Sequence, residues 1–397
     1  MNIKEIQKLI KYTVLNNIAL AKAGKSPVSL NIIGESGIGK TDSIREVCAT
    51  MDIPFLEVDL SGREDVGDLL GLPIEKYEVC LPNSDCEWVP STLIDYYHNK
   101  GYVFTGRSRM EYSIPQSMMI DPSRPMVLYL DDYSRATPSI LQAAMTLLKD
   151  GKINNWILPK GSTVICSSNP DDGEYHVTAV DNAHSTRNIR VNAKFDLNIW
   201  LENYGLTNVD ERGVNFLLNF KDELKFKSEK NVVGVNIRLW TMFFDQISGL
   251  TDWDKDLVMI KNLMTEDQFG KEYPLLFTKF VSGKLDKLPS IEYIFNEDIT
   301  KIDDLFKEIT KSRLDVVNIL KERITFFCMS LTKEDSNFEK YCNRLKELLN
   351  LTHIFPNDHL WTMITTLGGN KDIPMVPLNE QYNRIAKINK AEDKKSK

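Results

Sequence analysis

The sequence predicts an α/β fold with a parallel sheet in its first half and a helical region in its second half. Up to about residue 200, short apolar segments alternate with segments of helical spacing, which is the pattern of a parallel sheet covered by helices. A glycine-rich turn, "GESGIGKT", separates the first predicted strand from its helix. Beyond residue 200 the strand signals fade while helical spacing continues. We therefore expect an α/β core over residues 1–200 and two helical regions over residues 201–290 and 291–397.

The elements of the first half follow from their periodicity. Residues 2–22 place Ile3, Ile6 and Ile10 on one face of an amphipathic helix. The continuous apolar run at 125–132 is typical of a strand buried on both faces of a parallel sheet. The other expected strands cover residues 28–34, 54–61, 163–169 and 188–197, the expected helices cover 41–51 and 139–151, and a hairpin is expected at 151–162. Residues 62–125 show little periodicity, so we expect long loops with short elements there.

The second half is expected to be helical throughout. The helical patterns cover residues 198–205, 212–224, 236–249, 252–264, 302–327 and 337–350. The tail at 389–397 is charged and has no apolar anchors, so we expect it to be a disordered basic tail.

The bulk composition sets limits on partners and compartment. The length of 397 residues exceeds what one compact domain usually holds. A net charge of −7 gives no general attraction to nucleic acid or membrane surfaces, and no apolar run reaches the length of a membrane span. The segment after Met1 lacks the basic and apolar series of a signal peptide. We therefore expect a cytoplasmic protein with no membrane partner.

The cysteines are scattered and form neither a CxxC pair nor a zinc-like cluster with histidine. We expect them to be free thiols, as is usual in a reducing cytoplasm. They are Cys48, Cys80, Cys86, Cys166, Cys328 and Cys342.

The glycine-rich turn fits the phosphate-binding pattern GxxxxGK[ST] between a strand and a helix. Its glycines allow the backbone to curve so that successive N–H groups point into one concavity, and the N-terminus of the next helix adds further N–H donors. Lys40 would reach the β- and γ-phosphates of ATP, and the Thr41 hydroxyl would bind Mg²⁺. The residues expected to bind the nucleotide are Gly34, Glu35, Ser36, Gly37, Ile38, Gly39, Lys40 and Thr41.

Polar side chains end two later strands, at the sheet edge where open α/β sheets bind ligands. We expect Asp131 to hold Mg²⁺ through water and Asp132 to orient or deprotonate the attacking water. Asn169 is expected to hold that water against the γ-phosphate. The alternatives are a helix-capping aspartate for the acids and an Asx turn before Pro170 for Asn169.

Together these motifs resemble the MoxR branch of the AAA+ ATPases over roughly residues 25–245. The resemblance also rests on "VDLSGREDVGDLLGLP", "EWVPSTL", "LDDYSRATPSILQAAMTLLKDGKI", "WILPKGSTVICSSNP", "VDNAHSTRNIRV" and "NIRLWTMF". It implies an ASCE-type P-loop sheet, a helical lid over residues 201–290 with an additional C-terminal helical region, and a ring-shaped homo-oligomer, commonly a hexamer. The "DDYSRA" version is similar to phage-encoded members, which implies the cytoplasm of a bacterium or of a phage-infected host.

The resemblance also implies roles by matching position. Arg187 becomes the arginine finger that a subunit supplies to its neighbour's γ-phosphate, and Arg238 becomes sensor 2 of the lid. Asn169 becomes sensor 1, and Arg135 becomes the arginine of the turn after Walker B, facing the subunit boundary. For Arg187 and Arg238 the alternative is a surface arginine in a salt bridge.

Three positions depart from the pattern of that family. Asp132 stands where the family usually has glutamate, and its shorter side chain would activate water more weakly. Asn188 follows Arg187 in place of an aromatic residue, which leaves Arg190 as a rival for the finger. Ile237 replaces the proline before the sensor 2 arginine.

The segment "TGRSRMEYSIP" interleaves basic and aromatic residues, including Arg107, Arg109 and Tyr112. Such a segment could grip a peptide or single-stranded nucleic acid in the pore of a ring. We favour the plainer interpretation of a variable surface insert.

The resemblance implies a Mg²⁺-dependent ATPase that remodels or matures a protein partner. In the MoxR branch this role is often chaperone-like and frequently involves a von Willebrand A-domain protein. Two alternatives stay open. One is a motor or loader stimulated by nucleic acid, which the acidic balance disfavours. The other is a nucleotide-gated scaffold with little hydrolysis, which the shorter acid Asp132 favours.

Overall fold

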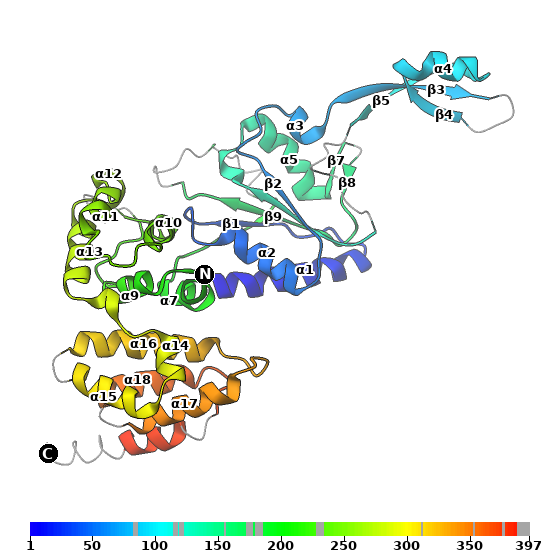
Figure 1. The fold of residues 1–397 in the computed structure, drawn as a ribbon. Coiled ribbons are helices and arrows are strands. Elements are labelled where there is room, and N and C mark those ends of the chain that lie inside the picture. The colour runs from blue at the N-terminus through cyan, green and yellow to red at the C-terminus, as the bar shows by residue number, and fades with distance from the viewer. Residues whose placement is uncertain are drawn as a thin grey trace. The chain divides into compact units, whose positions relative to one another are not determined.

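The structure is a computed structural model that divides the chain into two compact units, Met1–Phe195 and Asp196–Lys397 (Figure 1). It describes residues 1–81, 86–113, 118, 123–154, 156–171, 178, 186–227, 234–310, 313–351, 354–374 and 378–386. The tail predicted to be disordered, 389–397, lies outside these described residues.

The first unit is built on a five-stranded parallel sheet in the order β10-β1-β9-β6-β2. Its strands are β1 (Leu30–Ile33), β2 (Phe55–Asp59), β6 (Val127–Asp131), β9 (Thr163–Ser168) and β10 (Ile189–Asn192). The glycine-rich turn therefore follows a central strand, and the strand ending in Asp131 is separated from it only by β9. This is the ASCE-type order that the resemblance implies. The predicted α/β fold class is confirmed.

Alternate residues of the buried strands feed two cores on opposite faces of the sheet. On one face, α1 (Ile3–Lys22) and α2 (Lys40–Thr50) pack against β1, β6 and β9; on the other, α5 (Pro138–Asp150) packs against β6 and β9. In β6, for example, Tyr129 faces the α1 and α2 side while Leu128 and Leu130 face the α5 side. Because both faces are covered, the strands are continuously apolar, as predicted for 125–132.

The helix ends explain why these segments are helical. α1 starts with a capping box, in which the Asn2 side chain accepts from the Glu5 amide at 3.0 Å and the Asn2 amide donates to the Glu5 carboxylate at 2.9 Å. α5 starts with Thr137 as N-cap and ends at Gly151 in the left-handed conformation. The predicted hairpin follows directly, as β7 (Lys152–Ile153) and β8 (Trp156–Ile157).

The prediction of long loops over residues 62–125 is wrong for most of that segment. After α3 (Gly67–Leu70), a separate antiparallel sheet forms in the order β4-β3-β5, with strands β3 (Pro73–Cys80), β4 (Cys86–Pro90) and β5 (Val103–Tyr112) (Figure 1). A short helix, α4 (Ile94–Asn99), follows η1 (Ser91–Leu93) between β4 and β5. We call residues 73–112 the insert sheet. Most of its strand residues are exposed, so the alternation of apolar and polar residues that marks a strand is weak here.

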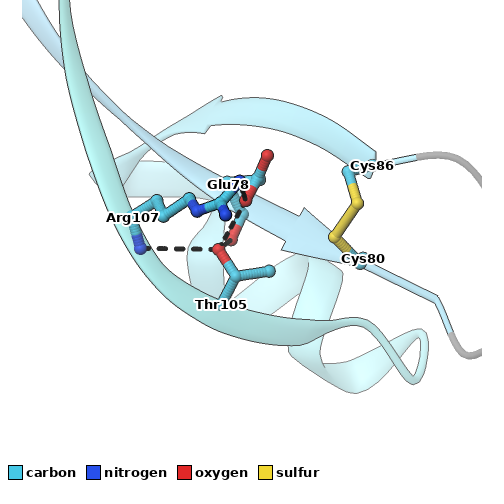
Figure 2. The surroundings of a disulfide bond; sticks show 5 residues. All are labelled: Glu78, Cys80, Cys86, Thr105 and Arg107. Carbon is cyan, nitrogen blue, oxygen red and sulfur yellow. Dashed lines mark hydrogen bonds and ion pairs between the residues drawn. A yellow bond between two sulfur atoms is a disulfide. The ribbon is translucent and has the colours of Figure 1, made fainter.

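The prediction of free thiols is wrong for two cysteines. Cys80 and Cys86 form a disulfide between the paired ends of β3 and β4, with Cα atoms 4.2 Å apart (Figure 2). The two residues are directly opposite in an antiparallel pair, which brings their Cβ atoms into disulfide range. Cys48, Cys166 and Cys328 are free and buried, and Cys342 is free and partly buried. Burial raises the pKa of Cys48 to about 11, so this thiol is unreactive.

The second unit is helical, as predicted. Its helices are α7 (Leu197–Trp200), the π-helix η4 (Leu201–Gly205), α8 (Leu206–Asn208), α9 (Glu211–Asn219), α10 (Ile237–Ile247), α11 (Leu257–Leu263), α12 (Glu266–Phe269), α13 (Glu272–Ser282), η5 (Leu285–Lys287), α14 (Ile291–Asn296), α15 (Ile299–Thr310), α16 (Leu314–Ser330), α17 (Phe338–Asn350) and α18 (Asn357–Leu367). An aromatic cluster forms its first core, where Phe216 packs against Trp240, Phe244, Phe277 and Phe280 with ring centroids 5.1–6.1 Å apart. None of the described helices has the length and apolar character needed to cross a membrane.

A buried arginine joins the two helical regions of the second unit. Arg323 of α16 is fully buried, forms an ion pair with Glu211 of α9 and donates to the Pro289 carbonyl at 3.1 Å. Glu211 also accepts from the amide of Ile291 at 2.9 Å. Residues of 201–290 and 291–397 are therefore held together at this point.

Candidate nucleotide-binding site

The turn from Gly34 to Thr41 requires glycine for two different reasons. At Gly34 the space is filled, because a Cβ there would lie 2.7 Å from Ile38 Cδ1 and 2.8 Å from Ala193 Cβ. At Gly39 the space is open, but φ is +88°, in the left-handed region that favours glycine. Gly39 is also the N-cap of α2. The backbone of the turn is therefore closely packed at Gly34, and α2 begins directly after Gly39.

Lys40 curls back over this turn. Its ammonium group donates to the Gly34 carbonyl at 2.6 Å and to the Glu35 carbonyl at 2.8 Å, and the residue is only 9% exposed. The positive charge is thus held against the backbone of the turn, next to the N-terminus of α2. A helix N-terminus and a lysine in this arrangement form a site for an anion such as phosphate.

Thr41 and Asp131 meet beside the turn. The Thr41 hydroxyl lies 3.4 Å from Asp131 Oδ2, and both groups also contact the hydroxyl of Tyr129, at 3.0 Å from Thr41 Oγ1 and 2.7 Å from Asp131 Oδ1. Ser167 of β9 donates to the same Asp131 oxygen, as does the Asp132 amide at 2.9 Å. Three donors therefore fix one carboxylate oxygen, while Oδ2 is directed to Thr41.

The carboxylate of Asp131 is held in its charged form. Burial alone would raise the pKa of Asp131. Hydrogen bonds from Ser167 and Tyr129 outweigh burial, and the charge of Lys40 adds to them, so the pKa lies below its ordinary value. Burial raises the pKa of the Tyr129 hydroxyl, which therefore keeps its proton.

The side-chain oxygens of Thr41 and Asp131 fit a magnesium ion that also binds phosphate. Hydroxyl and carboxylate oxygens are the ligands that Mg²⁺ prefers, and Mg²⁺ usually takes one or two protein ligands and completes its shell with phosphate and water. Among the described residues, no group of three or more His, Cys, Asp or Glu side chains could hold a metal alone. The pair Thr41 and Asp131 suits the shared arrangement, because both oxygens lie next to the predicted phosphate position.

Asp132 points in a different direction from Asp131. Its backbone is left-handed, with φ at 50°, and its side chain is 32% exposed. It forms an ion pair with Arg135 at 3.4 Å. A non-glycine residue in this conformation carries strain, which is common at functional sites. Both acids are partly buried, but Asp131 is fixed by three donors while Asp132 lies against Arg135.

Asn169 lies beside this segment. It follows β9 directly and is 7% exposed, and its backbone N–H donates to the Ser134 hydroxyl at 2.9 Å. Because β9 lies between β1 and β6, Asn169 emerges between the glycine-rich turn and Asp132. The structure therefore brings together Lys40, Thr41, Asp131, Asp132 and Asn169 at one edge of the sheet.

Arg187 lies at the opposite edge. It comes just before β10, whose first residue pairs with the first residue of β1, whereas the glycine-rich turn follows the end of β1. The β1–β10 pairing is four residues long, so the two ends of these strands are about 13 Å apart. Arg190 lies within β10, opposite Asn31. Burial raises the pKa of the Tyr133 hydroxyl, and the charges of Arg190 and Arg187 act against that rise.

Arg238 belongs to the second unit. It is the second residue of α10 and is exposed, while Ile237 before it is buried.

The basic residues of the insert sheet are paired with acids. Arg107 lies 3.6 Å from the Glu78 carboxylate, which also accepts from Thr105 at 2.7 Å (Figure 2). Arg109 pairs with Glu111 and stacks on Trp88 at 4.3 Å. The predicted basic and aromatic segment is thus neutralised locally, and its residues 114–115 lie outside the described ones.

Sequence reasoning missed Tyr129 and Ser167. Tyr129 precedes Asp131 by two residues, so both side chains lie on the same face of β6, and that spacing could have indicated their contact. Ser167 comes from another strand, and its contact depends on the pairing of β6 with β9.

Comparisons with known proteins find only weak similarity. No protein-family model and no curated protein matches the sequence. Among solved structures, a point mutant of RuvB from Thermotoga maritima is similar, with 11% identity, a TM-score of 0.32, and 78% of each chain covered. The RuvB Holliday junction branch migration motor of the same organism has 10% identity, a TM-score of 0.33, and coverage of 70% of this chain and 76% of its own. These scores are low, so the fold class rests on the sheet order described above.

Proposed function

We propose that the chain is an ATPase of the AAA+ superfamily and of the MoxR type. It binds ATP with Mg²⁺, hydrolyses it within a homo-oligomeric ring, and uses the cycle to remodel or mature a protein partner. The observation that carries the proposal is the meeting of Thr41 and Asp131, 3.4 Å apart, beside a turn that holds Lys40. The ring size of six and a von Willebrand A-domain partner follow from the resemblance alone.

The binding step rests on the backbone and on Lys40. The N–H groups of the turn and of the start of α2 bind phosphate oxygens. Lys40 leaves the Gly34 and Glu35 carbonyls and binds the terminal phosphates. Mg²⁺ held by Thr41 and Asp131 neutralises charge on the β- and γ-phosphates.

The hydrolysis step rests on polar side chains that follow β6 and β9. Asp132 orients the attacking water, and Asn169 binds that water or the γ-phosphate from the neighbouring strand. Arg187 precedes β10, at the amino end of the sheet. Following the resemblance, we assign it to the site of a neighbouring subunit. Arg238 acts as sensor 2 from the region 201–290, which is then the lid.

A binding experiment tests the nucleotide site. Lys40→Ala should abolish binding of a fluorescent ATP analogue to the full chain. Lys25→Ala removes the same charge from an exposed position before β1 and should leave binding unchanged. Equal affinities for the two variants would refute the site.

A mixing experiment tests the ring and the finger. Asp132→Asn and Arg187→Ala should each abolish ATP hydrolysis alone. In an equal mixture, about a quarter of the subunit interfaces would combine an intact Asp132 with an intact Arg187 from the neighbour, so about that share of activity should return. If mixing restores nothing, Arg187 does not act between subunits. The same experiment with Arg190→Ala decides between the two arginines.

The nucleotide-gated scaffold remains a second candidate because of one observation. Arg135 donates to Asp132 Oδ2 at 3.4 Å, which occupies one of the two carboxylate oxygens that would act on water. A chain of this kind would bind ATP and form rings but hydrolyse ATP negligibly, and Arg135→Ala would raise the rate.

Two further features of the proposal are open to direct tests. The arginines of the insert sheet are paired with acids, which disfavours a nucleic-acid motor; stimulation of ATP hydrolysis by DNA or RNA would favour that alternative.

We also propose a cytoplasmic location, against which the Cys80–Cys86 disulfide argues. Mass spectrometry of the alkylated protein from intact cells would show whether that disulfide forms there.

A further inference from the structure

Tyr129 lies at the centre of the site but has no part in the function proposed above. It is fully buried in β6 and stacks on Phe55, with ring centroids 6.0 Å apart and an angle of 24° between the rings. The ring is therefore fixed, and its hydroxyl is held at one point between Thr41 and Asp131.

The hydrogen bonds at this point have a defined direction. The Tyr129 hydroxyl donates to Asp131 Oδ1 at 2.7 Å. A phenol has one proton, so the same oxygen accepts from Thr41 at 3.0 Å. Among the described residues, the other acceptor near the Thr41 hydroxyl is Asp131 Oδ2, which is more distant at 3.4 Å. The Thr41 proton is therefore directed at Tyr129.

This direction matters because a hydroxyl binds a metal ion through its lone pairs. When the Thr41 proton points to Tyr129, the lone pairs of Thr41 are free on the other side. The same tyrosine fixes Asp131 Oδ1, which leaves Oδ2 for the ion or for a water on it. Partners outside the ligand shell commonly orient metal ligands in this way.

We propose that Tyr129 is a positioning residue for the divalent cation of this site, acting through Thr41 and Asp131. The inference rests on the proposed ATP and Mg²⁺ site and adds a residue to it. The predicted effect is on the cation and not on the nucleotide, because the hydrogen bonds of the Tyr129 hydroxyl join it to Thr41 and Asp131, the two residues assigned to the ion.

The test compares Tyr129→Phe with the wild-type chain. A fluorescent, slowly hydrolysed ATP analogue is bound first in EDTA and then in a titration with MgCl₂. Affinity in EDTA should agree within about twofold, while the Mg²⁺ concentration at half-effect should rise about tenfold, the lower end for the loss of such a partner. Phenylalanine keeps the ring and its packing on Phe55, and thermal unfolding without nucleotide checks that the variant is folded.

Tyr133→Phe is the matched control. Tyr133 is also buried, at 2% exposure, but its hydroxyl has no hydrogen-bond partner within the described part of the chain. It should leave the Mg²⁺ midpoint unchanged. A second variant, Ser167→Ala, removes a donor to Asp131 that does not touch Thr41, so it should raise the midpoint less than Tyr129→Phe does.

The outcomes separate this inference from the proposed function. A Mg²⁺ midpoint for Tyr129→Phe within twofold of the wild type would overturn the inference, and so would an equal rise in Tyr133→Phe. A rise in Ser167→Ala that equals or exceeds that of Tyr129→Phe would overturn the part played by Thr41. Failure of the wild-type chain to bind the analogue at all would overturn the proposed function instead.

Discussion

Replacing Gly34 by alanine should damage both the stability of the first unit and its affinity for ATP. The added Cβ would lie 2.7 Å from Ile38 Cδ1, 2.8 Å from Ala193 Cβ and 3.2 Å from the Ala193 carbonyl oxygen. Ile38 is 6% exposed and has little room to turn. Ala193 cannot turn at all, because its Cβ and carbonyl are fixed to the end of β10. The backbone of the glycine-rich turn must therefore move.

The size of the effect follows from these contacts. Overpacking of this kind costs about 1–3 kcal/mol. At about 2–4 °C per kcal/mol for a domain of this size, the melting temperature should fall by about 2–12 °C. The Gly34 carbonyl holds Lys40 at 2.6 Å, so its movement also displaces the lysine, and ATP affinity should fall about tenfold, or about 1.4 kcal/mol.

Gly62→Ala is the control for this experiment. A Cβ at Gly62 would meet only Asp59 Oδ2, at an ordinary 3.5 Å, so the change should stay within about 0.5 kcal/mol. Calorimetry measures the melting temperature, and titration with a fluorescent ATP analogue measures the affinity. Gly34→Ala and Gly62→Ala behaving alike in both assays would refute the reasoning.

Four further outcomes follow from the contacts described above. Asp132→Asn should keep ATP affinity within about twofold but lower hydrolysis about 10²–10⁴-fold, the usual contribution of a general base; equal losses in binding and rate would show a structural role instead. Arg323→Met should unfold at the same or a higher temperature, because a buried charge is replaced by an apolar chain of similar length, whereas Glu211→Ala strands that charge and should lower the unfolding temperature; the reverse order in a thermal melt would contradict this. Asp131→Asn should lose stability at neutral pH, and its deficit should shrink as the pH falls below about 4, because the ionised form of Asp131 stabilises the fold only above that range; a deficit independent of pH would argue against it. Cys80→Ser should open the insert sheet to proteolysis between β3 and β4 without changing ATP affinity, as limited digestion and nucleotide titration would show.

Much of the first unit could be predicted because its signals are local. The strand at 125–132 is apolar throughout because both of its faces are covered, and the glycine-rich turn is a contiguous motif. The helix at 2–22 has its cap in the adjacent residues Asn2 and Glu5. Each of these features depends on residues that are close in the sequence.

The insert sheet could not be predicted in the same way. Its strands are exposed, and β3 pairs with β5 across about thirty residues with an irregularity at Glu78, opposite Gly106. The pairing that joins Cys80 to Cys86 depends on that register, so spacing alone did not reveal it. The role of Tyr129 could not be predicted for a related reason. In a buried strand it counts as one more apolar residue, and its hydroxyl gains a function only when α2 packs over β6.

Arg323 shows the limit of helical periodicity. In the segment 302–327 an arginine is expected on the solvent side, and the pattern holds no sign of an acid more than a hundred residues earlier that accepts it. Tertiary contacts of this kind decide burial independently of local spacing.

Ala193 links the wall of the glycine-rich turn to the rest of the chain. Its amide donates to the Ile33 carbonyl at 2.7 Å, its Cβ lies against Gly34, and only two residues separate it from Asp196, where the second unit begins. The wall of the glycine-rich turn is therefore built by the last residues of the first unit, and a change of backbone at Ala193 would alter the turn directly.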